Sequence, residues 1–287
     1  VPARVASGHP AGRSPTEASI GAIDRDDLIA FHDAYYGPAT TVLAVSGDFD
    51  AEAMLARLEE LFGAWDADVE PPPELPPFDP TPDRRVFLAP KPLQQSIVIV
   101  GRPAMRAYQE PYAAFTVANE ILGAGGFGSR LFQEIRSRRG LAYATGSQLS
   151  QGFELPGTFL AYAFTRADAT GQVLELLLGE LERLREQEVS EEELDRAVTT
   201  LVNQSVFRDT SVAAVVERTA RVELLGLPAG YWERHLARMQ QLGPEDVRAA
   251  AVEVLDPDHL VMLVLGDEAA FDRTLSEFGE VERIEIE

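Results

Sequence analysis

The front of the chain combines two helical patterns with one short apolar run. Apolar residues recur every three or four positions in 24–36 and again in 51–64, which predicts two amphipathic helices. Gly37 and Pro38 end the first helix. Between the helices, TTVLAVSGD at 40–48 is apolar and ends in a Gly-Asp turn, which predicts a short buried strand.

A proline-dense, acidic segment follows the second helix. Prolines favour an extended, stiff backbone, so residues 69–83 are predicted to be an interdomain linker between residues 1–68 and residues 84–287. Beyond it, strand-like and helix-like patterns alternate. The predicted strands are 84–90, 94–103, 143–150 and 157–164, and the predicted helices lie near 110–123, 168–187 and 191–207.

Two of these later helices carry further signals. Ser190 and Glu193 form the S-x-x-E pattern of a capping box, which predicts where the last helix begins. The helix before it has a leucine stripe that is predicted to be buried. The stripe consists of Leu174, Leu177, Leu178, Leu181 and Leu184.

The two ends of the chain are similar to each other. Residues 25–50, RDDLIAFHDAYYGPATTVLAVSGDFD, match residues 244–269, PEDVRAAAVEVLDPDHLVMLVLGDEA, at a constant offset of 219. Both copies continue to a Phe-Gly pair, which predicts a second amphipathic helix in each copy. The aligned positions include Asp27 with Asp246, Pro38 with Pro257, Asp48 with Asp267, and Phe62-Gly63 with Phe278-Gly279.

This repeat predicts an α+β fold built from duplicated domains, each with helices packed on a mixed or antiparallel sheet. A second copy that starts near residue 84 places the start of the first copy roughly 135 residues before Val1. We therefore expect a first domain that is truncated at its front and an intact protein of about 420 residues. Val1 in place of an initiator Met favours a proteolytic cut or a fragment boundary.

Charge and composition exclude several classes of function. A net charge of −22 disfavours nucleic-acid and membrane-surface partners. No apolar run is long enough to span a bilayer, and residues 1–20 lack the layout of a signal peptide, so we expect a cytoplasmic location. The absence of cysteine removes disulfides, thiolate metal sites and cysteine nucleophiles.

Catalytic motifs are absent from the sequence. The four histidines, at 9, 32, 235 and 259, have no i, i+4 pairing that would place two imidazoles on one helical face for zinc. A G-x-S-x-G elbow and a phosphate-binding loop are also missing. We therefore predict no metal or cofactor site in this chain.

One stretch does carry recognisable chemistry. GAGGFGSRLFQEIRSRRGLAY, residues 123–143, resembles the second-domain signature of the M16 metallopeptidases, and the flanking sequences agree over essentially the whole chain. The match consists of Gly125, Gly126, Ser129, Arg130, Leu131, the seven-residue spacing from Arg136 to Tyr143, and the GLAY ending.

The resemblance implies different functions for the two domains. In that family the first domain binds zinc through a His-x-x-Glu-His helix, which this chain lacks, and the second domain contributes an Arg and a Tyr that reach the substrate. It therefore implies that Arg136 and Tyr143 bind substrate, as donors that stabilise the oxyanion of peptide hydrolysis. The expected partners are a peptide and a zinc-bearing M16 domain, in cis or on a partner subunit of a homo- or heterodimer.

The neighbouring residues have more ordinary interpretations. From spacing alone, an arginine on such a helix is most often a solvated charge, and Arg130 is expected to pair with a neighbouring acid. Gly125, Gly126 and Gly128 form a mobile turn, which could gate entry to a peptide cavity.

Three hypotheses on function remain. The first is the substrate-binding, non-zinc portion of an M16-type peptidase that is inactive alone. The second is a scaffold or assembly subunit that kept the fold without proteolysis. The third is a small-molecule carrier that uses an interdomain cavity.

Overall fold

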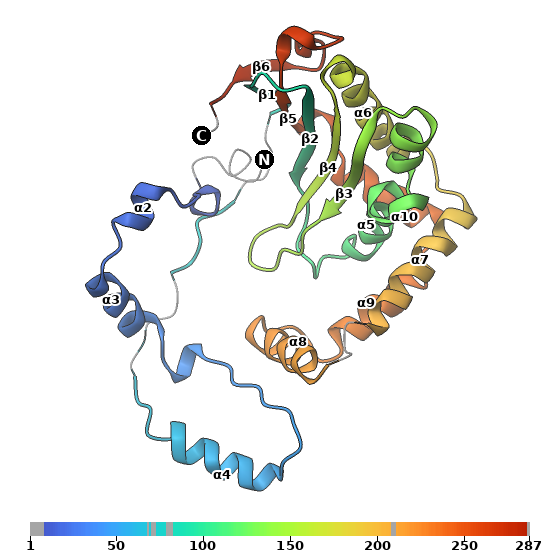
Figure 1. The fold of residues 1–287 in the computed structure, drawn as a ribbon. Helices are drawn as coiled ribbons and strands as arrows, with labels where there is room; N and C mark the ends of the chain where they lie inside the picture. Colours follow the sequence, from blue (N-terminus) through green and yellow to red (C-terminus); the bar gives the residue numbers. More distant parts are fainter. Residues whose placement is uncertain (1–8, 68, 70–72, 79–82, 208–210, 286–287) are drawn as a thin grey trace. The chain divides into compact units, whose positions relative to one another are not determined.

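The computed structural model describes residues 9–67, 69, 73–78, 83–207 and 211–285 (Figure 1). These residues divide into two compact units. Among the described residues, the larger unit comprises 9–12, 77–203 and 234–285, and the smaller unit comprises 13–76 and 204–233.

The larger unit is built around a mixed six-stranded sheet in the order β3-β4-β2-β5-β1-β6 (Figure 1). The pairs β3–β4, β4–β2 and β2–β5 are antiparallel, whereas β5–β1 and β1–β6 are parallel. The strands are β1 (Arg85–Pro90), β2 (Gln95–Pro103), β3 (Ala142–Leu149), β4 (Thr158–Arg166), β5 (Val261–Gly266) and β6 (Glu280–Arg283). The α+β prediction and the four predicted strands of this unit are confirmed.

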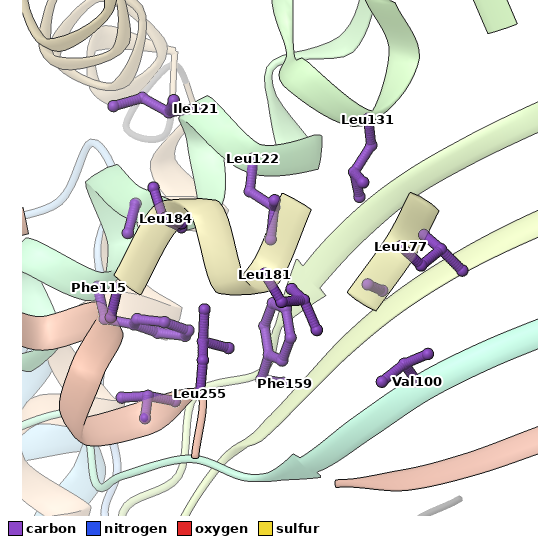
Figure 2. Packing of buried hydrophobic residues seen from close by; sticks show 14 of the residues in the cluster. Val100, Phe115, Ile121, Leu122, Leu131, Phe159, Leu177, Leu181, Leu184 and Leu255 are labelled. Atoms are coloured by element: carbon purple, nitrogen blue, oxygen red, sulfur yellow. The ribbon is translucent and has the colours of Figure 1, made fainter. Parts of the chain in front are cut away.

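Helices α5 (Tyr112–Asn119) and α6 (Thr170–Glu186) pack on this sheet, and α10 (Pro244–Val254) packs on both helices. The leucine stripe of α6 is buried, except that Leu178 is only partly covered. Phe115 of α5 meets Phe159 of β4 edge to face, with ring centroids 5.4 Å apart, beneath the α6 leucines (Figure 2). This close-packed core gives the unit a rigid framework.

Two further helices are α7 (Glu191–Val206) and α9 (Tyr231–Met239). The predicted capping box of α7 is confirmed. The Ser190 backbone N–H donates to Glu193 Oε2 at 3.0 Å, and the Glu193 backbone N–H donates to Ser190 Oγ at 3.2 Å. Both groups would otherwise lack a partner at the helix start.

The smaller unit holds short helices. Both predicted helices are confirmed, as α3 and α4. Asp24 and Asp50 begin them by accepting backbone N–H groups of the first turn. The elements are α2 (Glu17–Gly21), α3 (Arg25–Tyr35), the 3-10 turn η2 (Pro38–Thr40), α4 (Ala51–Phe62) and α8 (Val212–Leu224).

The sequence repeat is also a structural repeat. Helices α3 and α10 begin and end at positions 219 residues apart, and so do the 3-10 turns η2 and η7 (Pro257–His259). The capping is shared as well, because Asp27 accepts the backbone N–H of Asp24 and Asp246 accepts that of Gly243.

The predicted strand at 40–48 is wrong. In the second copy the equivalent residues form β5, which pairs with β1 on one side and β2 on the other. Among the described residues no strand pairs with 40–48. Thr40 ends the turn η2, residues 41–46 have no regular structure, and the chain bends at 47–48. A strand exists only with a neighbour that takes its backbone groups.

The second amphipathic helix predicted before Phe278 is also wrong. Residues 267–279 instead hold two 3-10 turns, η8 (Glu268–Ala270) and η9 (Leu275–Glu277). Asp272 lies between them and accepts the backbone N–H groups of Gly171 at 2.7 Å and Gln172 at 3.0 Å, at the start of α6. Its carboxylate caps another helix, which fixes the segment in a non-helical path.

We predict that Asp272→Ala lowers the free energy of unfolding by about 1 kcal/mol, because two N–H groups of α6 lose their cap. Asp272→Asn retains one amide oxygen as acceptor and is expected to lose less. Urea unfolding of the wild type and both variants measures this. Equal stability of all three would contradict the capping role.

Candidate functional site

The candidate site lies on one continuous segment between α5 and β3. Helix α5 continues into a π-helical turn, η3 (Glu120–Ala124), in which the Gly125 N–H donates to the Glu120 carbonyl oxygen at 2.9 Å. A glycine turn, η4 (Gly126–Gly128), and a second π-helical segment, η5 (Phe132–Arg138), follow. π-Helical turns are rare and frequently occur at functional sites.

The segment is attached to α7 by a largely buried ion pair. Arg130 is bidentate on Glu193, with Nε 2.7 Å from Oε1 and an Nη atom 2.9 Å from Oε2. The Arg130 hydrogen bonds lower the pKa of Glu193 to about 2. The expectation that Arg130 pairs with an acid is confirmed. Because Glu193 also caps α7, one carboxylate fixes both elements.

The remaining arginines of η5 differ in their surroundings. Arg138 and Arg139 both donate to Glu134, at 2.9 Å and 3.0 Å, and the hydrogen bond from Arg139 contributes most to lowering the pKa of this carboxyl. Arg136 has no carboxylate partner among the described residues. Its guanidinium carbon lies 4.9 Å from the ring centroid of Phe132 and 5.6 Å from that of Tyr143.

Tyr143 is presented by a β-bulge. The pairing of β3 with β4 shifts register between Ala142 and Ala144, so Tyr143 is the extra residue on its strand. Bulges re-aim side chains and are common next to active sites. Tyr143 is exposed, and its ring contacts the Arg136 guanidinium. The structure thus brings together the two residues that the family resemblance singled out.

The backbone of the glycine loop is held by polar side chains. Ser129 Oγ donates to the Gly126 carbonyl at 2.8 Å, and Gln133 Nε2 donates to that of Phe127 at 2.5 Å. Arg196 of α7 reaches the Gly128 carbonyl at 3.4 Å. Gly126 has a φ of +59°, which L side chains rarely adopt. Side chains therefore contact three successive carbonyl groups of the loop, and the mobility of this turn stays a prediction.

Beneath the loop lies a buried carboxyl group. Glu120 is buried, and burial raises its pKa. A side chain added at Gly125 would lie 2.7 Å from the Glu120 carbonyl oxygen, which explains the glycine there. Glu120 and Arg196 of α7 both line a small pocket of about 50 Å³.

Sequence reasoning missed the aromatic part of this surface. The ring of Phe127, at the tip of the glycine loop, meets that of Phe132 edge to face at 4.9 Å, and the face of Phe132 receives Arg136. The restraining residues Gln133 and Arg196 were also missed. Phe127 within GGFGS was the available signal, because a large apolar residue between turn glycines has little local cover.

Within the described ranges, no group of three or more His, Asp or Glu residues is arranged so that it could hold a metal ion. His259 Nδ1 lies 2.7 Å from Asp256, and His32 stacks on Tyr36, so these two imidazoles contact separate partners. In the same residues, no helix combines the length and apolar character needed to cross a bilayer.

Comparison with known proteins identifies the class of this α+β chain. A family profile described as "Peptidase M16 inactive domain" matches residues 22–201, which is more than half of the chain. The chain belongs to the M16 peptidase family, and the matched part corresponds to its inactive, non-catalytic domain.

Relatives of known sequence agree. An uncharacterized zinc protease of Streptomyces coelicolor is 32% identical over 247 residues, covering 84% of this chain and 53% of that protein. An uncharacterized zinc protease of Mycobacterium tuberculosis strain H37Rv is 29% identical over 254 residues, covering 86% and 57%. The chain therefore spans little more than half the length of these relatives.

A solved structure shows the same fold. The peptidase M16 inactive domain from Pseudomonas fluorescens superposes with a TM-score of 0.85 at 26% identity, covering 94% of this chain and 65% of that one. Complex III from Candida albicans contains a chain with a TM-score of 0.76 at 18% identity, covering 92% and 65%, which is a likeness of fold alone.

We predict that Glu193→Gln lowers the free energy of unfolding at pH 7 by about 3 kcal/mol, because Arg130 stays buried without its counter-charge. The folded pKa of Glu193 lies below its ordinary value of 4.5, so its contribution is complete above that pH and is lost as the pH falls towards about 2. The difference between wild type and variant is therefore expected to shrink over this interval in urea unfolding.

Glu192→Gln is the matched control, because Glu192 is exposed and its only ion-pair contact among the described residues, with Arg196, is long at 3.9 Å. It should change stability by less than about 0.5 kcal/mol at any pH. A difference between wild type and Glu193→Gln that does not vary with pH would contradict the role of the ion pair.

Proposed function

We propose that this chain is the substrate-binding, non-zinc portion of an M16-type zinc peptidase, in which Arg136 and Tyr143 contact the peptide. One observation carries the proposal. Of the four arginines between residues 130 and 139, three are bound to carboxylates, whereas Arg136 has none among the described residues and lies against Tyr143. Its donors are therefore available to a ligand.

The two side chains suit a peptide carbonyl. A guanidinium offers several N–H donors and a phenol offers one O–H donor. Directed at the carbonyl of the bond to be cleaved, these donors stabilise the negative charge that develops on its oxygen. Both groups are exposed in this chain. Their effect would increase when a partner domain covers them and excludes water.

The residues described here do not fit a zinc site, because their histidines and carboxylates do not converge on one point. In this proposal the metal belongs to a His-x-x-Glu-His domain, in cis or on a partner subunit, and the chain alone is inactive. A homodimer or a heterodimer would satisfy the same requirement.

The two structural copies indicate what the partner domain must supply. Val247 in α10 is 0% exposed, whereas Leu28, its counterpart in α3, is 62% exposed. In the same way, Met262 in β5 is 0% exposed and Leu43 is 56% exposed. The first copy therefore presents, uncovered, a surface that the second copy buries in its core.

We infer that a segment outside this sequence completes the first domain around residues 42–47, with one parallel and one antiparallel strand as around β5. The proposed division into residues 1–68, a linker at 69–83 and residues 84–287 follows from the same comparison. The linker overlaps positions 70–72 and 79–82, which lie outside the described residues.

In a protein that includes the zinc-bearing domain, Arg136→Ala should lower kcat for a peptide substrate at least tenfold, as loss of an oxyanion donor does. Tyr143→Phe, which removes only the O–H group, should also lower kcat. Arg138→Ala is the matched control, because Glu134 already occupies that guanidinium. Turnover of an internally quenched peptide measures all three.

Unchanged turnover in Arg136→Ala and Tyr143→Phe would refute the donor role and favour a scaffold without proteolysis. Equal losses in Arg136→Ala and Arg138→Ala would indicate a general charge effect and would also refute it.

Hydrogen exchange tests the proposed completion of the first domain. Amides 42–47 should exchange freely in the 287-residue chain and be slowed by roughly 100-fold in a protein that carries the complete first domain. Amides 261–266 of β5 serve as the internal control and should be protected in both proteins. Equal exchange of 42–47 in the two proteins would contradict the completion.

A further inference from the structure

The glycine loop presents one large side chain. Phe127 has a large apolar side chain, yet it is 77% exposed. Its neighbours Gly126 and Gly128 have no side chains that could cover it. Because side chains hold the carbonyls of three successive loop residues, the ring extends from a restrained backbone. Such a ring is well placed to bind a ligand, because the backbone that carries it loses little further conformational freedom on contact.

The ring also adjoins the proposed donor pair. Phe127 and Phe132 have centroids 4.9 Å apart, and the Arg136 guanidinium lies 4.9 Å from the Phe132 ring. The Phe127 ring is therefore no more than about 10 Å from the Arg136 guanidinium. An extended peptide advances about 3.3 Å per residue, so this distance corresponds to about three residues.

We propose that Phe127, supported by Phe132, is a specificity-determining residue that binds an aliphatic or aromatic side chain of the peptide. This inference rests on the proposed function, because Arg136 and Tyr143 must hold a peptide carbonyl for the neighbouring side chain to reach the loop. The recognised side chain lies within three residues of that carbonyl.

The chemistry of the surface selects an apolar group. The two rings have no strong hydrogen-bond donor or acceptor. They therefore bind most favourably to an apolar side chain, because the contact removes the apolar surface of both partners from water. An acidic side chain would instead be drawn to the neighbouring Arg136. A small polar side chain would leave Phe127 exposed, as it is now.

The test uses a protein that includes the zinc-bearing domain and a set of internally quenched peptides. The peptides differ at one position at a time, over three residues on either side of the cleaved bond, and carry Phe, Leu or Ser there. At one position the wild type should prefer Phe or Leu over Ser by roughly tenfold in kcat/KM, as one buried apolar side chain allows. Phe127→Ala should reduce this ratio to near one.

Two controls define the outcome. Phe127→Leu keeps an apolar side chain and should retain most of the preference. Tyr108→Ala removes an exposed aromatic ring outside the loop and should leave the ratio unchanged. Thermal melting of Phe127→Ala should match the wild type, since the side chain is exposed.

The outcomes separate this inference from the function on which it rests. An unchanged ratio in Phe127→Ala, or an equal loss on all peptides, overturns the specificity role, while a loss of turnover in Arg136→Ala still supports the proposed function. Failure to cleave any of the peptides, with the zinc domain present and metal-loaded, overturns both.

Discussion

The ion pair between Arg130 and Glu193 fixes the segment on which the candidate site depends. It joins the start of η5 to the start of α7, and Glu193 is at the same time part of the α7 capping box. A bidentate, largely buried pair holds direction as well as distance. Segment η5, which follows Arg130, places Arg136 against Tyr143 at the β-bulge. Gln133 of η5 and Arg196 of α7 donate hydrogen bonds to backbone carbonyls of the glycine loop.

The second constraint is that the apolar surface of each copy of the repeat must be covered by neighbouring elements. The two copies of the repeat share their helix, their 3-10 turn and their capping carboxylate. Within the described part of the chain, however, only the second copy has strands on both sides of its central segment. The same pattern is therefore a core strand in one place and an exposed segment in the other. Local sequence sets the helices, whereas the sheet requires neighbours.

The sequence was sufficient for elements whose signals are local. The first helix of each copy, helix α4, the capping box of Ser190 and Glu193, and four strands of the sheet were predicted correctly. The strand at 40–48 failed because no strand among the described residues pairs with it. The helix before Phe278 failed because Asp272 is bound to the start of α6, about 100 residues away in the chain.

The site was predictable in part. The resemblance to the M16 family indicated Arg136 and Tyr143, whereas spacing alone favoured a solvated arginine on this helix. The pairing of Arg130 with Glu193 spans 63 positions, and the bulge at Tyr143 depends on the register of β3 on β4, so neither partner nor geometry could be deduced from the local pattern. Phe127 became a candidate only when its exposure was known.

The central claim is that Arg136 and Tyr143 donate hydrogen bonds to a peptide carbonyl. The most direct test is a structure of the protein with its zinc-bearing domain and a bound, uncleaved peptide. In that structure an Arg136 N–H group and the Tyr143 O–H group should lie within about 3 Å of one carbonyl oxygen of the peptide. An Arg136 that is paired with a carboxylate of the other domain, with the peptide bound elsewhere, would contradict it.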